Sequence, residues 1–192
     1  MISKDKDDKL VRIYCFICDR FKDLEFYCER FSNNNKPIFT DQEIMTIYLY
    51  IMHHEGHVKV NRIHRFAAEH LKSWFPNIGS YQAFNNRLNK LSGAFTRLTE
   101  ILIEEHQPDD CCLNQSLLDS MPIITCSGKR SGKVAAEITD KGFCSTKGIY
   151  YYGLKLHFLG FRRIGKLPHP EQILYTSASV NDVTVFKEAW SE

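Results

Sequence analysis

The strongest constraint on the fold of this 192-residue chain is a change in the spacing of apolar residues at positions 107–110. Before this point, apolar residues recur every three or four positions, as at Phe84, Leu88, Leu91 and Phe95, which predicts helices. After it, apolar residues alternate with polar ones or form short runs, which predicts strands. Helices followed by strands, without regular alternation, predict an α+β chain with helical residues 1–108 and a sheet in residues 109–192.

Three strands and one helix are expected in the second region. Residues 117–123 form a short, mostly apolar run, which is typical of a buried strand covered on both faces. Residues 150–158 alternate, which predicts a strand with one apolar face and a less apolar face carrying Lys155 and His157. A third strand is expected near residues 172–178, and a helix then opens with the capping pair Asn181-Asp182, of which Asp182 is interpreted as the N-cap. The stretch 127–148 is rich in Gly, Ser and Lys and is expected to be a basic loop.

Asp119 interrupts the apolar run at residues 117–123. An ionised aspartate is costly to bury unless it is paired, hydrogen-bonded or bound to a cation. Asp119 is therefore expected either at the strand's end near water or as a metal ligand. The alternative is a turn residue, because Asp-Ser-x-Pro is common turn chemistry and Pro122 would complete the turn.

Two helices, at residues 60–75 and from Ser80 through Leu102, are expected to form a helix-turn-helix-like pair near residues 60–91. The first turns of the second helix carry amide and arginine side chains, which can bond base edges in the major groove of DNA. The expected DNA-binding residues of this pair are Arg62, Arg65, Gln82, Asn85, Asn86, Arg87 and Lys90. The alternative is a polar, solvent-facing side of an all-helical bundle.

Charge is distributed unevenly along the chain although the net charge is only +2. Residues 58–99 carry seven Lys/Arg and one acid, and residues 120–170 carry nine Lys/Arg and two acids. Residues 100–119 lie between these blocks and carry six acids and no Lys or Arg. Two basic blocks favour a polyanionic partner such as nucleic acid, with solvated lysines on an ordinary enzyme as the alternative.

Composition narrows the class and the location further. Seven cysteines, an odd number, fit free thiols in a reducing cytoplasm, and the Cys15–Cys18 pair is interpreted as core packing because no second CxxC follows. The run at residues 53–57 lacks the HExxH order of a zinc helix and is interpreted as a helix end. No apolar run approaches the roughly 18 residues of a membrane span, and the N-terminus lacks a signal-peptide core, so no membrane partner is expected.

Three short blocks in the second region resemble those of insertion-sequence transposases of the DDE class. The first is Leu118-Asp119-Ser120-x-Pro122-Ile123, which is similar to the block that carries the family's first catalytic Asp. The second is Lys147-Gly148 followed by residues 152–157, similar to the family's KG…yGyKlH block, and the third is residues 176–182. The resemblance implies a ribonuclease-H-like catalytic domain in residues 109–192, preceded by an N-terminal all-helical DNA-binding region.

The resemblance also implies metal-dependent phosphodiester cleavage and strand transfer on DNA. The family holds two divalent ions, Mg²⁺ or Mn²⁺, with two Asp and one Glu, and Asp119 matches the first of these ligands as a catalytic and metal-binding residue. No strand carrying the second Asp is recognised before residue 192, and Glu188 is expected to be solvated. We therefore expect an incomplete catalytic domain, a truncated transposase with weak or absent metal binding and no activity alone.

The implied partner is DNA, at the terminal inverted repeats of a mobile element, and the family also allows a homo-oligomer. Phosphate contacts are expected from Lys155, Arg162 and Arg163, and from basic residues of the predicted loops, namely Lys129, Arg130, Lys133 and Lys166. One alternative is a non-catalytic DNA-binding fragment that inhibits the intact transposase. Another is an unrelated, metal-free α+β protein with basic loops.

Overall fold

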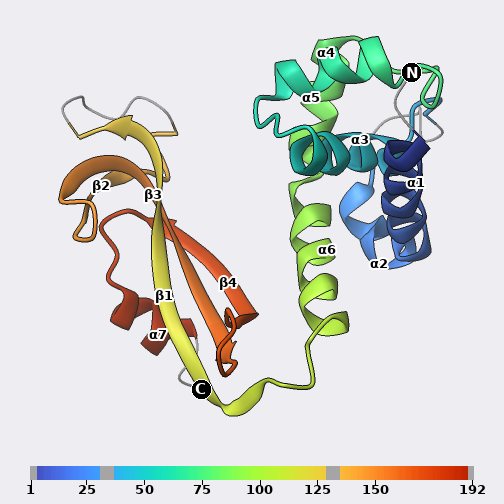
Figure 1. The fold of residues 1–192 in the computed structure, drawn as a ribbon. Helices are drawn as coiled ribbons and strands as arrows, with labels where there is room; N and C mark the ends of the chain where they lie inside the picture. The colour runs from blue at the N-terminus through green and yellow to red at the C-terminus, as the bar shows by residue number, and fades with distance from the viewer. Residues whose placement is uncertain (1–3, 31–36, 129–134, 190–192) are drawn as a thin grey trace. The chain divides into compact units, whose positions relative to one another are not determined.

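The computed structural model describes residues 4–30, 37–128 and 135–189 of the chain. The chain divides into two compact units, Met1–Ile101 and Leu102–Glu192. Helices make up the first unit, and a sheet with a C-terminal helix dominates the second (Figure 1). The predicted α+β class, with helices before strands, is confirmed. The division falls inside a helix, before the boundary at residue 108 that the sequence suggested.

The helical region begins with two helices and a short 3₁₀ turn and continues through four further helices. Its elements are α1 (Lys4–Asp19), α2 (Phe21–Leu24), η1 (Glu25–Cys28), α3 (Asp41–His54), α4 (Val60–His70), α5 (Tyr81–Lys90) and α6 (Ser92–Glu105). Within the described ranges, every helix is either too short or too polar to cross a bilayer.

Helix α3 forms the centre of the helical unit and contacts α1, α4 and α5. Its apolar side chains are fully buried, among them Ile44, Ile47 and Ile51. The helix begins with a capping box: the Thr40 hydroxyl accepts the Glu43 N–H, and the Glu43 carboxylate accepts the Thr40 N–H at 2.6 Å. Local sequence and burial therefore agree about where α3 starts and what it packs against.

Helices α4 and α5 are shorter than the periodicity predicted. Helix α4 ends at His70, so its predicted continuation to residue 75 is wrong; Pro76 accounts only for the end of this stretch, since it disfavours helix at Phe75. The second predicted helix is broken at Leu91 into α5 and α6, because Ser92 and Gly93 propagate a helix poorly. Helix α5 begins with a side-chain cap, in which the Ser80 hydroxyl accepts the main-chain N–H of Ala83.

Some side chains expected in the helical core are exposed instead. Cys15 and Cys18 lie on the outer side of α1, so their interpretation as core residues is wrong. Trp74 follows α4 and is exposed, with its indole N–H donated to Asp7 at 3.1 Å. A polar partner at the surface holds this indole where the helical periodicity would have turned it inward.

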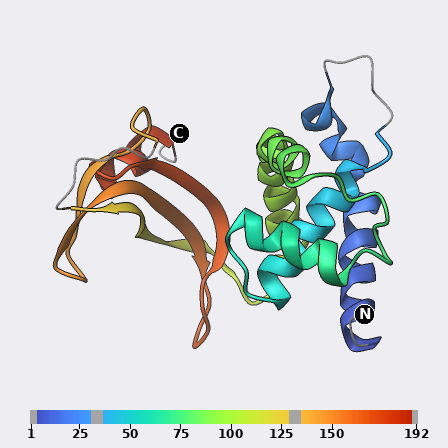
Figure 2. The same ribbon diagram turned by 90° about the horizontal axis from the view of Figure 1, so that it is seen from above.

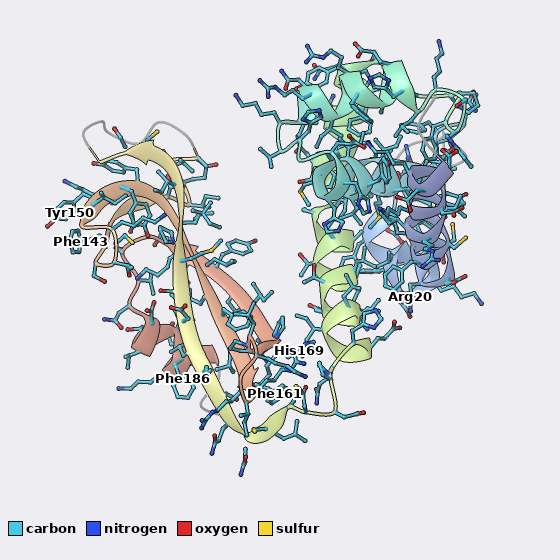
Figure 3. The ribbon with its side chains drawn as sticks, in the orientation of Figure 1. Arg20, Phe143, Tyr150, Phe161, His169 and Phe186 are labelled. Carbon is cyan, nitrogen blue, oxygen red and sulfur yellow. The ribbon has the colours of Figure 1, made fainter. Side chains whose placement is uncertain are left out.

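The second unit contains one antiparallel sheet and a helix. Its elements are β1 (Cys112–Ser127), β2 (Asp140–Cys144), β3 (Ile149–Arg162), β4 (His169–Ser177) and α7 (Asp182–Ala189). Strand β1 pairs with one edge of β3, while β2 and β4 pair with successive parts of its other edge. The three predicted strands and the helix are present, whereas β2 lies in a stretch predicted to be loop. The rings of Phe143 and Tyr150 lie side by side where β2 meets β3 (Figure 3).

The less apolar face of β3 is the buried one. Tyr151, His157 and Leu159 on this face are buried, and α7 packs over the same side with Val185 buried (Figures 1 and 2). The apolar face, which includes Phe158, stays half-exposed within this unit. Alternation therefore predicted the strand, but it did not predict which face of the sheet the helix would cover.

Gly153 allows β1 to approach β3 closely. A Cβ at this position would overlap the main-chain oxygen of Ile123 and lie 3.2 Å from the nitrogen of Thr125. The ladder between the two strands shifts register just beyond Ile124. A glycine is required here because any side chain would meet main-chain atoms rather than a movable side chain.

Candidate functional site

Asp119 lies in the middle of β1, opposite Phe158 of β3. The strand continues through Pro122 to its end at Ser127, so the alternative of a turn at Asp119 is wrong. The side chain is exposed, and one carboxylate oxygen accepts the Ser120 main-chain N–H at 2.8 Å. Asp119 is therefore exposed to solvent on a regular strand. Exposure is expected for an ionised carboxylate that has no cation partner, because burying it would be costly.

The expectation that this strand is buried on both faces is wrong. Most side chains of β1 are exposed, including Met121 at 57%. Within residues 112–128 and 135–189, β3 is the only strand that pairs with β1. One edge of β1 therefore lacks a strand partner in the part of the chain that the structure describes, and its apolar side chains remain uncovered in this unit.

Asp119 does not make a two-metal site with its described neighbours. Among those residues, no group of three or more His, Cys, Asp or Glu side chains is arranged to hold a metal ion. Mg²⁺ keeps most of its water unless several anionic oxygens surround it. The described residues therefore offer one carboxylate at Asp119. This donor set does not fit the two metal ions that the DDE family holds.

Asp182 takes a different place from the one the sequence predicted. The N-cap of α7 is Asn181, whose side-chain oxygen accepts the Val183 N–H at 2.9 Å, so the assignment of Asp182 as the cap is wrong. Asp182 is the first residue of the helix and turns toward the sheet. One of its carboxylate oxygens accepts the Ser120 hydroxyl of β1 at 3.0 Å.

The other Asp182 oxygen faces two basic side chains of β3. It lies 3.2 Å from Nδ1 of His157 and 3.5 Å from Nζ of Lys155. His157 is fully buried, and its Nε2 forms a hydrogen bond with the Thr176 hydroxyl of β4 at 2.8 Å. Burial lowers the pKa of His157, an effect that the Asp182 carboxylate opposes and the Lys155 ammonium reinforces.

This polar cluster joins the start of α7 to three strands. Lys155 also donates to the main-chain oxygen of Val180 at 2.8 Å and is mostly buried, so the expectation that it lines a DNA path is not supported by its position. The sequence contained one signal for the cluster, namely two polar residues alternating on one face of β3. The sequence assigns Lys155 of this face to DNA, because residue spacing does not show which face of the sheet α7 covers.

The polar side of α5 is exposed as predicted. Gln82, Asn86 and Lys90 are exposed on this helix, and Asn85 is half-buried. Gln82 donates its amide N–H to the Asn86 side-chain oxygen at 3.0 Å, which orders the two amides one turn apart. On the neighbouring α4, the predicted DNA-binding residues Arg62 and Arg65 are also exposed. These side chains are available to a partner in solution.

Arg87 is the exception among the predicted DNA-binding residues of α5. Its guanidinium donates to both oxygens of Asp41, at 2.8 and 2.6 Å, and also to the main-chain oxygen of Cys28. Arg30 donates to the same carboxylate at 2.6 Å. The Arg87 side chain is only 11% exposed, and its hydrogen bonds with Asp41 raise the pKa of the guanidinium. The expected exposed position of Arg87 is therefore wrong, and the residue holds the helical unit together.

The basic residues after β3 face acidic and amide side chains from the start of the second unit. Arg163 and Lys166 both donate to the Asp110 carboxylate, at 2.7 and 2.6 Å, and lower its pKa to about 2. Arg162 donates to the Gln115 side chain at 2.8 Å and remains exposed. The Asp110 carboxylate thus offsets the positive charge of Arg163, whereas the partner of Arg162 is an uncharged amide. The predicted contacts Lys129, Arg130 and Lys133 lie outside the described residues.

The chain was compared with models of protein families, with curated proteins and with solved structures. None of the three comparisons found a match. The resemblance to DDE transposases therefore rests on the three sequence blocks alone. The first block lies on β1, the second begins just before β3 and continues along it, and the third connects the end of β4 to the start of α7.

Proposed function

We propose that this chain is the DNA-binding region and the opening part of the catalytic domain of a DDE-class transposase. One observation carries the proposal. The sheet contains β1, β3 and β4 in antiparallel order followed by α7, with Asp119 in the middle of β1. In the transposase family, the ribonuclease-H-like domain begins with three such strands and a helix, and the first catalytic Asp lies on the first strand.

The helical unit supports the DNA-binding half of the proposal. Helix α5 presents exposed amides and a lysine, and α4 adds Arg62 and Arg65. Amide and guanidinium groups can bond base edges, while lysine contacts phosphate. DNA at the ends of a mobile element is the partner that this combination favours, because those ends must be recognised before they are cut.

The proposal assigns no strand transfer to these residues alone. Asp119 is one carboxylate, and the described residues place no second and third ligand beside it. We expect the remaining Asp and Glu of a complete site to come from further polypeptide. In this proposal the helical unit binds DNA, and the sheet carries one part of the catalytic site.

A second candidate function is a DNA-binding protein that regulates the intact transposase without cutting DNA. The pairing of β1 favours it, because its second edge has no strand partner among the described residues and offers main-chain groups to another polypeptide. A fragment that occupies the element's ends, or that joins the intact enzyme, would inhibit transposition.

Binding to labelled duplexes with a randomised central region, measured by fluorescence anisotropy over a series of salt concentrations, tests the DNA-binding role. We expect affinity to fall steeply with salt, as counterions are released from phosphates. Nicking of supercoiled plasmid with Mg²⁺ and then Mn²⁺ tests the catalytic part, and we expect none. Binding that is absent or indifferent to salt would refute the proposal, and metal-dependent nicking would show that the site is more complete than described.

A further inference from the structure

The described helical unit contains a cavity beside α5 that includes Asn86 and Lys90 of the proposed DNA-binding side but also extends to aromatic residues outside it. Its volume is about 750 Å³, within the range typical of small-ligand sites. It opens between the 3₁₀ turn η1 with the residues that follow it and one side of α5. The lining residues are Phe26, Tyr27, Glu29, Arg30, Ala83, Asn86, Arg87 and Lys90.

Two aromatic rings form one wall of this cavity and are exposed to solvent. Phe26 is 76% exposed and Tyr27 is 42% exposed, with ring centroids 5.4 Å apart in an edge-to-face arrangement. Gly93 at the start of α6 allows this placement, because a Cβ there would come within 2.8 Å of the Tyr27 ring. Large exposed rings beside a cavity leave flat apolar surface for a planar partner.

Cationic groups also line the cavity, from both of its sides: Arg30 after η1, and Arg87 and Lys90 on α5. Arg30 and Arg87 share the single carboxylate of Asp41, so this trio carries a net positive charge. Lys90 adds a second positive charge, and Glu29 at the cavity offsets one. Asn86 contributes an exposed amide from the same side of α5. The cavity therefore favours an anion, and its amide can donate to or accept from a polar ring edge.

We propose that this cavity binds an unpaired nucleotide of DNA, with the base against Phe26 and Tyr27 and the phosphate near Lys90 and Arg30. Stacking on aromatic side chains combined with backbone contacts to basic residues is how proteins hold single-stranded nucleic acid. An acidic peptide would use the cations but would leave both rings without a planar partner. The inference rests on the proposed DNA-binding function and extends it from duplex to single-stranded ends.

Two labelled DNAs distinguish the two roles of the helical unit. One is a blunt duplex, and the other is the same duplex with a 3′ overhang of thymidines. We expect the full chain to bind the overhang DNA more tightly than the blunt duplex. Phe26→Ala is expected to weaken overhang binding roughly tenfold and to leave blunt-duplex binding unchanged. Phe26→Trp keeps a stacking surface and is expected to retain the preference.

Matched variants exclude a general loss of apolar or basic surface. Val58→Ala alters a side chain as exposed as Phe26 in the same unit but away from this cavity, and we expect it to bind both DNAs as the unmodified chain does. Lys90→Gln is expected to reduce the salt dependence of overhang binding by about one phosphate contact. Lys72→Gln, which replaces another exposed lysine of the same unit, is the matched control.

The outcomes separate the inference from the proposal beneath it. Blunt duplex bound without any preference for the overhang, or a preference that survives Phe26→Ala, overturns the nucleotide site and leaves duplex binding in place. Binding of neither DNA overturns both. A preference lost in Phe26→Ala and retained in Phe26→Trp and Val58→Ala supports the site.

Discussion

At the scale of single residues, Arg87 has the most consequential position in the chain. Sequence alone placed it on a DNA-facing surface, because it lies among amides on the first turns of a helix. In the structure it reaches across to Asp41, a residue 46 positions earlier that also starts α3. A pair so distant in sequence leaves no local pattern, and each of its members also has an ordinary local explanation.

Replacing Arg87 with Met is expected to destabilise the helical unit by about 2 kcal/mol. The substitution leaves Asp41 buried with Arg30 as its remaining charged partner, and a buried carboxylate that loses a partner is costly. Lys90→Met on the same helix should change stability by less than about 0.5 kcal/mol, because Lys90 is exposed. Urea unfolding followed by circular dichroism compares the two. Equal stabilities would show that the Arg87–Asp41 pair contributes nothing.

At the scale of elements, periodicity predicted most helices and three of the four strands. It failed where a tertiary partner decides the outcome. The alternation at residues 150–158 identified β3, but α7 covers the side with His157 and leaves the side with Phe158 half-exposed. Likewise, the carboxylate of Asp182 contacts Ser120 and His157 of the sheet rather than capping its own helix. Neither choice follows from spacing, since both depend on how α7 packs against the strands.

The link between α7 and the sheet is expected to weaken at acidic pH. The pKa of His157 in the folded chain lies below its usual 6.5, so the unfolded chain takes up a proton first as pH falls. Stability should therefore decline below about pH 6.5 even though Asp182 faces the ring and partly offsets the effect. The Lys155 ammonium lies near the same Asp182 oxygen and favours the neutral form of the His157 imidazole.

Comparison of His157→Gln with the unmodified chain measures this contribution. We expect the variant to lose less stability between about pH 7.5 and about pH 5.5 in urea unfolding, because the substitution removes the proton uptake of His157 in the unfolded chain. A variant with an unchanged pH dependence would show that His157 does not take part. Lys155→Met is a useful second variant, since removing the ammonium should raise the pKa of His157 and shrink the loss.

At the scale of the whole molecule, one face of the sheet carries large apolar side chains that are exposed. Met121 of β1 is 57% exposed and Tyr175 of β4 is 69% exposed, on the side away from His157. Exposed apolar patches of this kind mark surfaces that bind other polypeptide. At the candidate site, the sequence predicted that Asp119 lies within a strand, but not that most side chains of this strand are exposed, because exposure depends on what packs against the sheet.

The full chain should bind a fluorescent apolar dye such as anilinonaphthalene sulfonate without being partly unfolded. Tyr175→Lys should reduce the dye's fluorescence, because it places a charge on the exposed apolar face of the sheet. Val58→Lys adds a charge to an equally prominent apolar side chain of the helical unit and should change the signal little. Weak dye fluorescence from the unmodified chain, or equal signals from both variants, would argue against an open face on the sheet.

The close approach at Gly153 has a consequence for how this protein tolerates genetic change. Because the obstacle at that position is main chain, a neighbouring compensatory mutation cannot create room by shrinking a side chain. In a library that randomises codons 152–154 and selects for folded product, the middle codon should return glycine, while its two neighbours should accept several bulky residues.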